Sequence, residues 1–195
     1  MQRTLRRFGP AYDQIRSADL LLFRPQWWAL HSKLICVAGR TDYCHAGMVG
    51  WSRFYRTPNC LEMVAGGGRE IPLAQQVEWY PGLIDVYQAN PENRWPKFDR
   101  VAAAAAMRRF VTRRYGWWNM LRVSLLHLPF VRLLVRPETD DQIESGRSPF
   151  CSHAVVLADR IAGGVDPVPH LADRMTEPGD LARSPFFKYA FTLVP

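Results

Sequence analysis

The apolar residues of this chain change their spacing about halfway along the sequence. The first half holds short segments rich in strand-forming residues, each bounded by glycine, proline or polar residues, at 19–24, 46–51, 61–65 and 83–87. Such segments are typical of a small, mainly antiparallel sheet. From Asp99 onward, apolar side chains recur at helical spacing as far as Tyr115, and Asp99 is placed to cap a helix. Strands followed by helices predict an α+β fold.

The length and composition of the chain fit one domain. Of the 195 residues, 48% are hydrophobic and 22% are charged, which is enough for a sizeable core. Because no internal repeat, linker or composition break divides the chain, we predict a single domain over residues 1–195. The formal charge of +7 favours anionic partners such as acidic polymers, lipid headgroups or nucleic acid, without selecting one.

The apolar segment 117–135 bears on membrane contact. Trp117, Trp118 and Arg122 could place a helix over 117–128 at a membrane surface, but we expect its apolar face to pack against the domain. Polar residues and Pro129 interrupt the segment, so no transmembrane helix is predicted. The basic start of the chain lacks the apolar core of a signal peptide, and export is not expected.

Cys151 is expected in the first turn of a helix. Ser148 suits the cap and Pro149 the first helical position, and a glycine pair suits the stop, so this helix should span about 149–162. Unpaired N–H groups and the helix dipole at that position favour a thiolate, and they can stabilise the oxyanion formed when it attacks a carbonyl. A buried structural cysteine is the alternative interpretation.

The other three cysteines, Cys36, Cys44 and Cys60, suggest neither a metal site nor a disulfide framework. The chain contains no Cys-x-x-Cys pair and no cysteine and histidine spacing typical of zinc sites. We therefore expect free thiols and predict no metal ion and no cofactor.

A thiol nucleophile needs a base, and His45 is the best placed of the five histidines. It begins a predicted strand in which the small residues Ala46 and Gly47 would let another element approach closely. His31 stays open as an alternative. The remaining histidines lie in an apolar helix, on the wrong face of the cysteine helix, or among prolines: His127, His153 and His170.

Glu62 is the expected partner of His45. It is a lone carboxylate in an apolar strand, and a hairpin over 53–59 would pair that strand with the His45 strand. A third polar group normally orients a catalytic imidazole and stabilises its charged form. Strand alternation allows Glu62 and His45 to share a face, but they are opposite or diagonal only in some registers. A Glu62 that faces solvent is the alternative.

Four segments carry a resemblance to a known family. In chain order they are 19–23, 43–49, 61–63 and 150–152. Together they resemble the permuted NlpC-type papain-like cysteine peptidases, which include the YiiX-like proteins and are related to lecithin retinol acyltransferase-like enzymes. As in that group, the histidine strand precedes the cysteine helix, by about a hundred residues. The family often has Ser-Glu after the cysteine, whereas this chain has Ser152-His153.

The resemblance implies a circularly permuted papain-like fold, with a small antiparallel sheet packed against the nucleophile helix. It makes Cys151 the nucleophile, His45 the base and Glu62 the orienting residue of a hydrolase that acts on peptide or amide bonds, cell-wall peptides included. Lipid acyl transfer or thioester cleavage is the alternative activity, and a non-catalytic virion or binding protein is the alternative class. Because no signal peptide or transmembrane helix is expected, and because the family also occurs in phage genomes, we expect a cytoplasmic or virion-associated protein. Its oligomeric state stays open.

Two further patterns are set aside. The glycine run 66–68 with Arg69 lacks the Lys-Ser/Thr of a P-loop, so we expect a flexible loop at the rim of the cleft. A cluster of arginines has no interleaved aromatic stacking pattern, so we expect a solvated face and no nucleic-acid partner. The cluster comprises Arg108, Arg109, Arg113 and Arg114.

Overall fold

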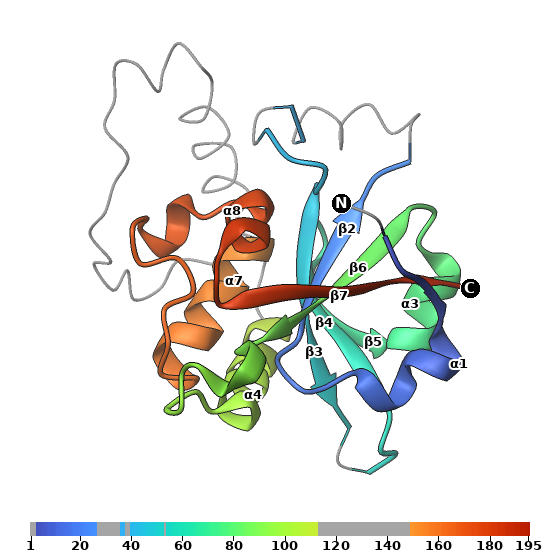
Figure 1. The fold of residues 1–195 in the computed structure, drawn as a ribbon, viewed down its shortest axis with the longest axis horizontal. Coiled ribbons are helices and arrows are strands. Elements are labelled where there is room, and N and C mark those ends of the chain that lie inside the picture. The colour runs from blue at the N-terminus through green and yellow to red at the C-terminus, as the bar shows by residue number, and fades with distance from the viewer. Residues whose placement is uncertain (1–2, 27–35, 38–39, 53, 113–148) are drawn as a thin grey trace.

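The computed structural model describes residues 3–26, 36–37, 40–52, 54–112 and 149–195. Within these ranges, seven strands form one sheet in the order β1-β7-β6-β2-β3-β4-β5 (Figure 1). Neighbouring strands are antiparallel except for β1 and β7, which are parallel. The strands are β1 (Leu5–Arg7), β2 (Leu20–Arg24), β3 (His45–Trp51), β4 (Pro58–Val64), β5 (Gly67–Pro72), β6 (Leu83–Ala89) and β7 (Phe187–Val194).

Helices cover both faces of the sheet. They are α1 (Phe8–Ala11), α3 (Leu73–Trp79), α4 (Arg100–Val111), α7 (Cys151–Leu157) and α8 (Pro178–Arg183). Short turns of 3-10 helix occur at Tyr12–Gln14, Pro91–Asn93 and Asp173–Met175, and a π-helical turn continues α7 over Ala158–Ala162. Among the helices of the described residues, none combines the length and apolar character that crossing a membrane requires.

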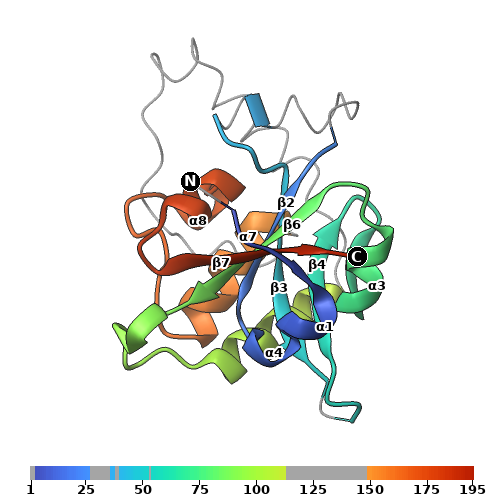
Figure 2. The same cartoon turned by 45° about the vertical axis from the view of Figure 1, so that its right-hand side comes forward.

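The sheet separates two apolar cores. Helices α4, α7 and α8 lie on one face, and α1 and α3 lie on the other (Figure 1, Figure 2). Strand β2 is buried along its whole length, because Leu20 and Leu22 point into the first core while Leu21 and Phe23 point into the second. Burial on both faces explains why this strand is a continuous apolar run instead of an alternating one.

The expected mixed α+β architecture is confirmed, but the sheet is larger than expected. The four predicted strands correspond to β2, β3, β4 and β6, with ends that differ by up to three residues. Strands β1, β5 and β7 were not predicted. The last of these follows the helices in the chain and returns to pair with β6, so the two halves of the sequence do not divide cleanly into sheet and helices.

The glycine run does not form the expected loop. Gly67 begins β5, and Gly68 pairs with Met63 of β4. A Cβ atom on Gly68 would lie 2.3 Å from the Cα atom of Val111, so the missing side chain lets α4 pack directly on this strand. The expectation of a loop is therefore wrong for 67–69, whereas Gly66 lies in the turn between β4 and β5, and Gly68 serves helix-to-sheet packing.

Helix α4 begins where the sequence predicts. The Asp99 carboxylate accepts hydrogen bonds from the backbone N–H groups of Val101 and Ala102, both at 2.9 Å. Its buried face consists of Ala103, Ala104 and Met107. Val101, one of the apolar residues at helical spacing after Asp99, is exposed. The helix predicted over 117–128 and the residues His31, His127, Arg113, Arg114, Tyr115 and Ser148 lie outside the described residues.

Helix α7 begins two residues later than expected. The chain is still extended at Phe150, whose side chain is buried in a small cluster with Cys151, Ala172 and Met175. That burial fixes the backbone of Phe150 outside the helix, so Cys151 is the first helical residue instead of Pro149. The placement of Cys151 in the first turn is confirmed.

Asp159, in the π-helical turn, is a buried carboxyl group without a hydrogen-bond partner in the described part of the chain. Burial raises the pKa of Asp159 well above its ordinary value, and the charge of Arg100 offsets only part of this effect. The folded protein therefore keeps the proton at pH values where the unfolded chain has released it. As a result, the free energy of unfolding falls as the pH rises above the unfolded-state pKa.

We expect Asp159→Asn to raise the melting temperature near neutral pH, because the amide has a similar shape and cannot ionise. The gain should be roughly 1.4 kcal/mol for each pH unit above the unfolded-state pKa, until the folded-state pKa is reached. Below about pH 4 it should disappear, because both states then hold the proton. Thermal unfolding across this range, with the exposed Asp13→Asn as control, tests the expectation. An unchanged pH dependence in the Asp159 variant would contradict it.

Candidate functional site

The register of the β3–β4 hairpin brings His45 and Glu62 together. Glu62 pairs with Gly47, so it lies diagonally across from His45 on the same face of the sheet. A Cβ atom on Gly47 would lie 3.4 Å from the Glu62 Cβ, so glycine leaves the space through which the carboxylate reaches the ring. The His45 Nε2 and Glu62 Oε2 atoms are 2.6 Å apart, and the Phe23 ring packs 4.9 Å from the imidazole.

Cys151 reaches His45 from the other side of the sheet. Helix α7 packs against β3 and β4 on one face of the sheet, whereas the His45 side chain lies on the other face. The Cys151 and His45 side chains meet at the end of the sheet where β3 begins with His45. The Cys151 sulfur is hydrogen-bonded to the His45 side chain and to the backbone N–H groups of Ala46 and Ser152.

The three residues expected to form the site are therefore brought together as a hydrogen-bonded chain. Glu62 is 1% exposed and Cys151 is 7% exposed, whereas 19% of the His45 side chain reaches solvent. A carbonyl compound can approach such a thiol only along its narrow exposed side. Neither the solvent-facing Glu62 nor an isolated structural Cys151 agrees with this arrangement.

The electrostatics of the site favour an ion pair between Cys151 and His45. Burial alone would lower the pKa of His45, but the neighbouring Cys151 sulfur and the Glu62 carboxylate outweigh it and raise that pKa to about 10. Burial likewise opposes ionisation of Cys151, yet His45 and two backbone N–H groups lower the pKa of the thiol. Despite its burial, Glu62 has a lowered pKa because His45 and Arg69 both contact it. These shifts favour a thiolate beside an imidazolium.

The remaining cysteines lack this environment. Burial raises the pKa of Cys36 to about 11 and that of Cys60 well above its ordinary value. The Cys44 sulfur lies 3.5 Å from the carbonyl oxygen of Phe23 and 3.7 Å from the Tyr80 hydroxyl. Cys151, by contrast, is hydrogen-bonded to His45, and its pKa is lowered.

His153 and His170 take no part in the candidate site. The His153 ring packs against Phe150, with ring centroids 5.5 Å apart. Burial, together with Arg174 and Arg160, lowers the pKa of His153 to about 4, so this residue is neutral near physiological pH. His170 is exposed. Of the described histidines, His45 is the one that contacts Cys151.

Arg69 is a site residue that the sequence does not identify. Its Nε atom donates to Glu62 Oε1 at 2.7 Å, and its guanidinium also donates to the Gln76 side chain at 3.3 Å. Arg69 lies directly opposite Glu62 in the β4–β5 register. Had 67–72 been predicted as a strand, the cross-strand pairing of unlike charges would have been the signal.

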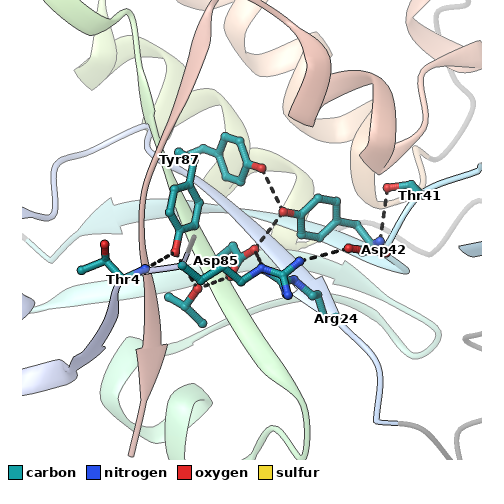
Figure 3. Close-up of polar contacts among 10 residues, drawn as sticks. Thr4, Arg24, Thr41, Asp42, Asp85 and Tyr87 are labelled. Atoms are coloured by element: carbon teal, nitrogen blue, oxygen red, sulfur yellow. Dashed lines mark hydrogen bonds and ion pairs between the residues drawn. The ribbon is translucent and has the colours of Figure 1, made fainter. Parts of the chain in front are cut away.

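A buried polar network holds the segment that leads into His45. The Asp85 carboxylate accepts hydrogen bonds from Tyr43 at 2.8 Å and from Thr192 at 2.5 Å, and it forms an ion pair with Arg24 (Figure 3). The Tyr43 hydroxyl also meets that of Tyr87 at 2.9 Å. This network links β2, β6 and β7 to the residues just before β3, which fixes the backbone from which His45 projects.

The described residues do not offer a ligand set for a metal ion. No group of three or more His, Cys, Asp or Glu side chains within them is arranged to hold one. At the candidate site itself, His45 and Arg69 occupy the two oxygens of Glu62. A metal ion there would have to displace one of these partners.

Comparison with known proteins gives one informative result. No family model matches the sequence, and no curated protein matches it. Among solved structures, the metalloprotein yiiX from Escherichia coli O157:H7 matches with a TM-score of 0.63 over 93% of this chain and 99% of its own. This chain has the fold of yiiX. The sequences are 16% identical, so the likeness concerns the fold alone. The YiiX-like part of the expected resemblance is thereby supported.

Proposed function

We propose that this chain is a cysteine hydrolase with a circularly permuted papain-like fold, acting on amide or peptide bonds. The observation that carries the proposal is the hydrogen-bonded chain that runs from Cys151, the first residue of α7, through His45 to Glu62. A nucleophile, a base and an orienting carboxylate in contact are what acyl transfer through a covalent intermediate requires. The chain order, with the histidine strand before the cysteine helix, supports the permuted class.

In the proposed reaction, the Cys151 thiolate attacks the substrate carbonyl carbon and forms a C–S bond. Backbone N–H groups beside Cys151 stabilise the oxyanion that results. His45 then gives its proton to the leaving amine as the C–N bond breaks, which leaves a thioester on Cys151. Water, deprotonated by the now neutral His45, attacks the thioester and releases the acid, and the ion pair is restored. Glu62 keeps the ring oriented throughout.

The substrates that we propose are peptides, with cell-wall peptides as the first class to test. The full chain is incubated with soluble peptidoglycan fragments and, separately, with long-chain acyl esters, and the products are analysed by mass spectrometry. We expect peptide fragments whose summed mass exceeds that of the substrate by one water. Turnover of the esters alone would replace the proposal with lipid acyl transfer or thioester chemistry. No turnover of either class would favour a non-catalytic binding or virion protein.

A further inference from the structure

The Glu62 carboxylate has two partners, one on each oxygen. Its Oε2 atom meets His45, and its Oε1 atom accepts from Arg69 Nε at 2.7 Å. Glu62 itself is almost fully buried, at 1% exposure, so water cannot take the place of a lost partner. Each contact therefore influences where the other oxygen points.

Arg69 is held at two points. The strand register places it directly opposite Glu62, and its guanidinium also donates to Gln76. Gln76 belongs to α3 and is 3% exposed, so packing fixes its position. An arginine that bonds to two fixed partners has little freedom to swing into solvent, although 44% of its side chain is exposed.

The proposed reaction makes this second partner necessary. His45 carries a positive charge at rest and loses it when the leaving amine takes its proton. At that stage Glu62 would be a buried anion with no counter-charge if His45 were its sole partner, which is costly in a protein interior. Arg69 supplies a charge that does not change with the protonation state of His45.

We propose that Arg69 is a positioning residue of the site: it holds the Glu62 carboxylate against His45, which helps to keep Cys151 ionised, and it balances the charge of Glu62 when His45 is neutral. The catalytic meaning of this inference rests on the proposed function. The predicted effect of Arg69 on the ionisation of Cys151 does not rest on the proposed function, because it concerns the thiol and the imidazole before any substrate binds.

The test is the pH dependence of Cys151 alkylation by iodoacetamide in the full-length chain, followed by peptide mapping. Removing the guanidinium in Arg69→Gln should raise the midpoint by about half a pH unit to one unit, because Glu62 is then no longer held against His45 and the imidazolium that supports the thiolate loses its fixed anionic partner. Arg69→Lys keeps the charge and should stay close to the parent midpoint. Should Arg69→Gln not fold, Arg69→Met retains the apolar stem and carries the same expectation.

Arg108→Gln is the matched control. Arg108 pairs with Glu70, the next residue of β5, and its guanidinium also bonds to the carbonyl of Trp51, so this change removes a neighbouring arginine charge without touching Glu62. Its midpoint should equal that of the parent. A parental midpoint in folded Arg69→Gln, or an equal rise in Arg69→Lys, would overturn the inference.

The outcomes separate this inference from the proposed function. A raised midpoint in Arg69→Gln, with a parent that turns over no peptide or ester, would support the role of Arg69 in the ion pair and count against the hydrolase. Peptide hydrolysis by the parent, with an unshifted midpoint in the variant, would count against Arg69 alone.

Discussion

Replacing Cys151 by alanine is expected to reduce peptide turnover at least about a thousandfold, and His45→Ala should have an effect of similar size. The first change removes the proposed nucleophile, and the second removes both the proposed base and the side chain that lowers the pKa of the thiol. Glu62→Gln should leave a reduced but measurable rate, because an amide can hold the ring without stabilising its charge. Steady-state rates on the peptide identified by mass spectrometry give the ordering.

The melting temperatures of these variants distinguish a residue that serves the site from one that stabilises the fold. Cys151 contributes one sulfur to a small cluster at the edge of the core, so Cys151→Ala should melt within a few degrees of the parent, about 1 kcal/mol or less. Cys36→Ala and His170→Ala serve as matched controls outside the site and should keep the parent rate. Full activity in either Cys151→Ala or His45→Ala would refute the assignment.

Iodoacetamide is expected to alkylate Cys151 at least about a hundredfold faster than Cys36 or Cys60 near neutral pH, because the thiolate is the reactive form. Although burial opposes its ionisation, contact with His45 lowers the pKa of Cys151, whereas burial raises that of Cys36 to about 11 and that of Cys60 well above its ordinary range. Timed quenching followed by peptide mapping measures each rate separately.

The sign of the pH dependence is part of the same prediction. Because the pKa of Cys151 is lowered, its fast reaction should persist as the pH falls below the ordinary thiol range, where Cys36 and Cys60 no longer react. In His45→Ala the midpoint should move up toward that of an unassisted buried thiol. Equal, slow alkylation of all cysteines in the parent would favour a non-catalytic protein that has kept the fold.

The sequence predicts the candidate site better than it predicts the sheet. The helix position of Cys151 follows from local signals, and the apolar strand around Glu62 is visible in the pattern. The contact between Glu62 and His45 is not, because a shift of one residue in the hairpin would have put the two side chains on opposite faces. The structure supplies that register, with Gly47 opposite Glu62.

What the sequence misses depends on residues far apart in the chain. The glycine run is typical of a loop, and only the packing of α4 against Gly68 explains why it forms a strand. Arg69 was overlooked because the segment that contains it was expected to be a loop and not a strand. The network around Asp85 joins β2 to β7, which are more than a hundred residues apart in the sequence, so no local sequence pattern predicts it. Strand β7 does carry an alternating apolar pattern, in a region for which no strand was predicted.

Capture of the acyl-enzyme tests the central claim most directly. The parent protein is mixed with a p-nitrophenyl ester, quenched in acid within seconds, and analysed as the intact chain and as peptides by mass spectrometry. We predict one acyl group, held as a thioester on Cys151 once p-nitrophenol has left, with no such adduct in Cys151→Ala and slow formation in His45→Ala. Acylation at another residue, or none on a folded parent protein, would contradict the account.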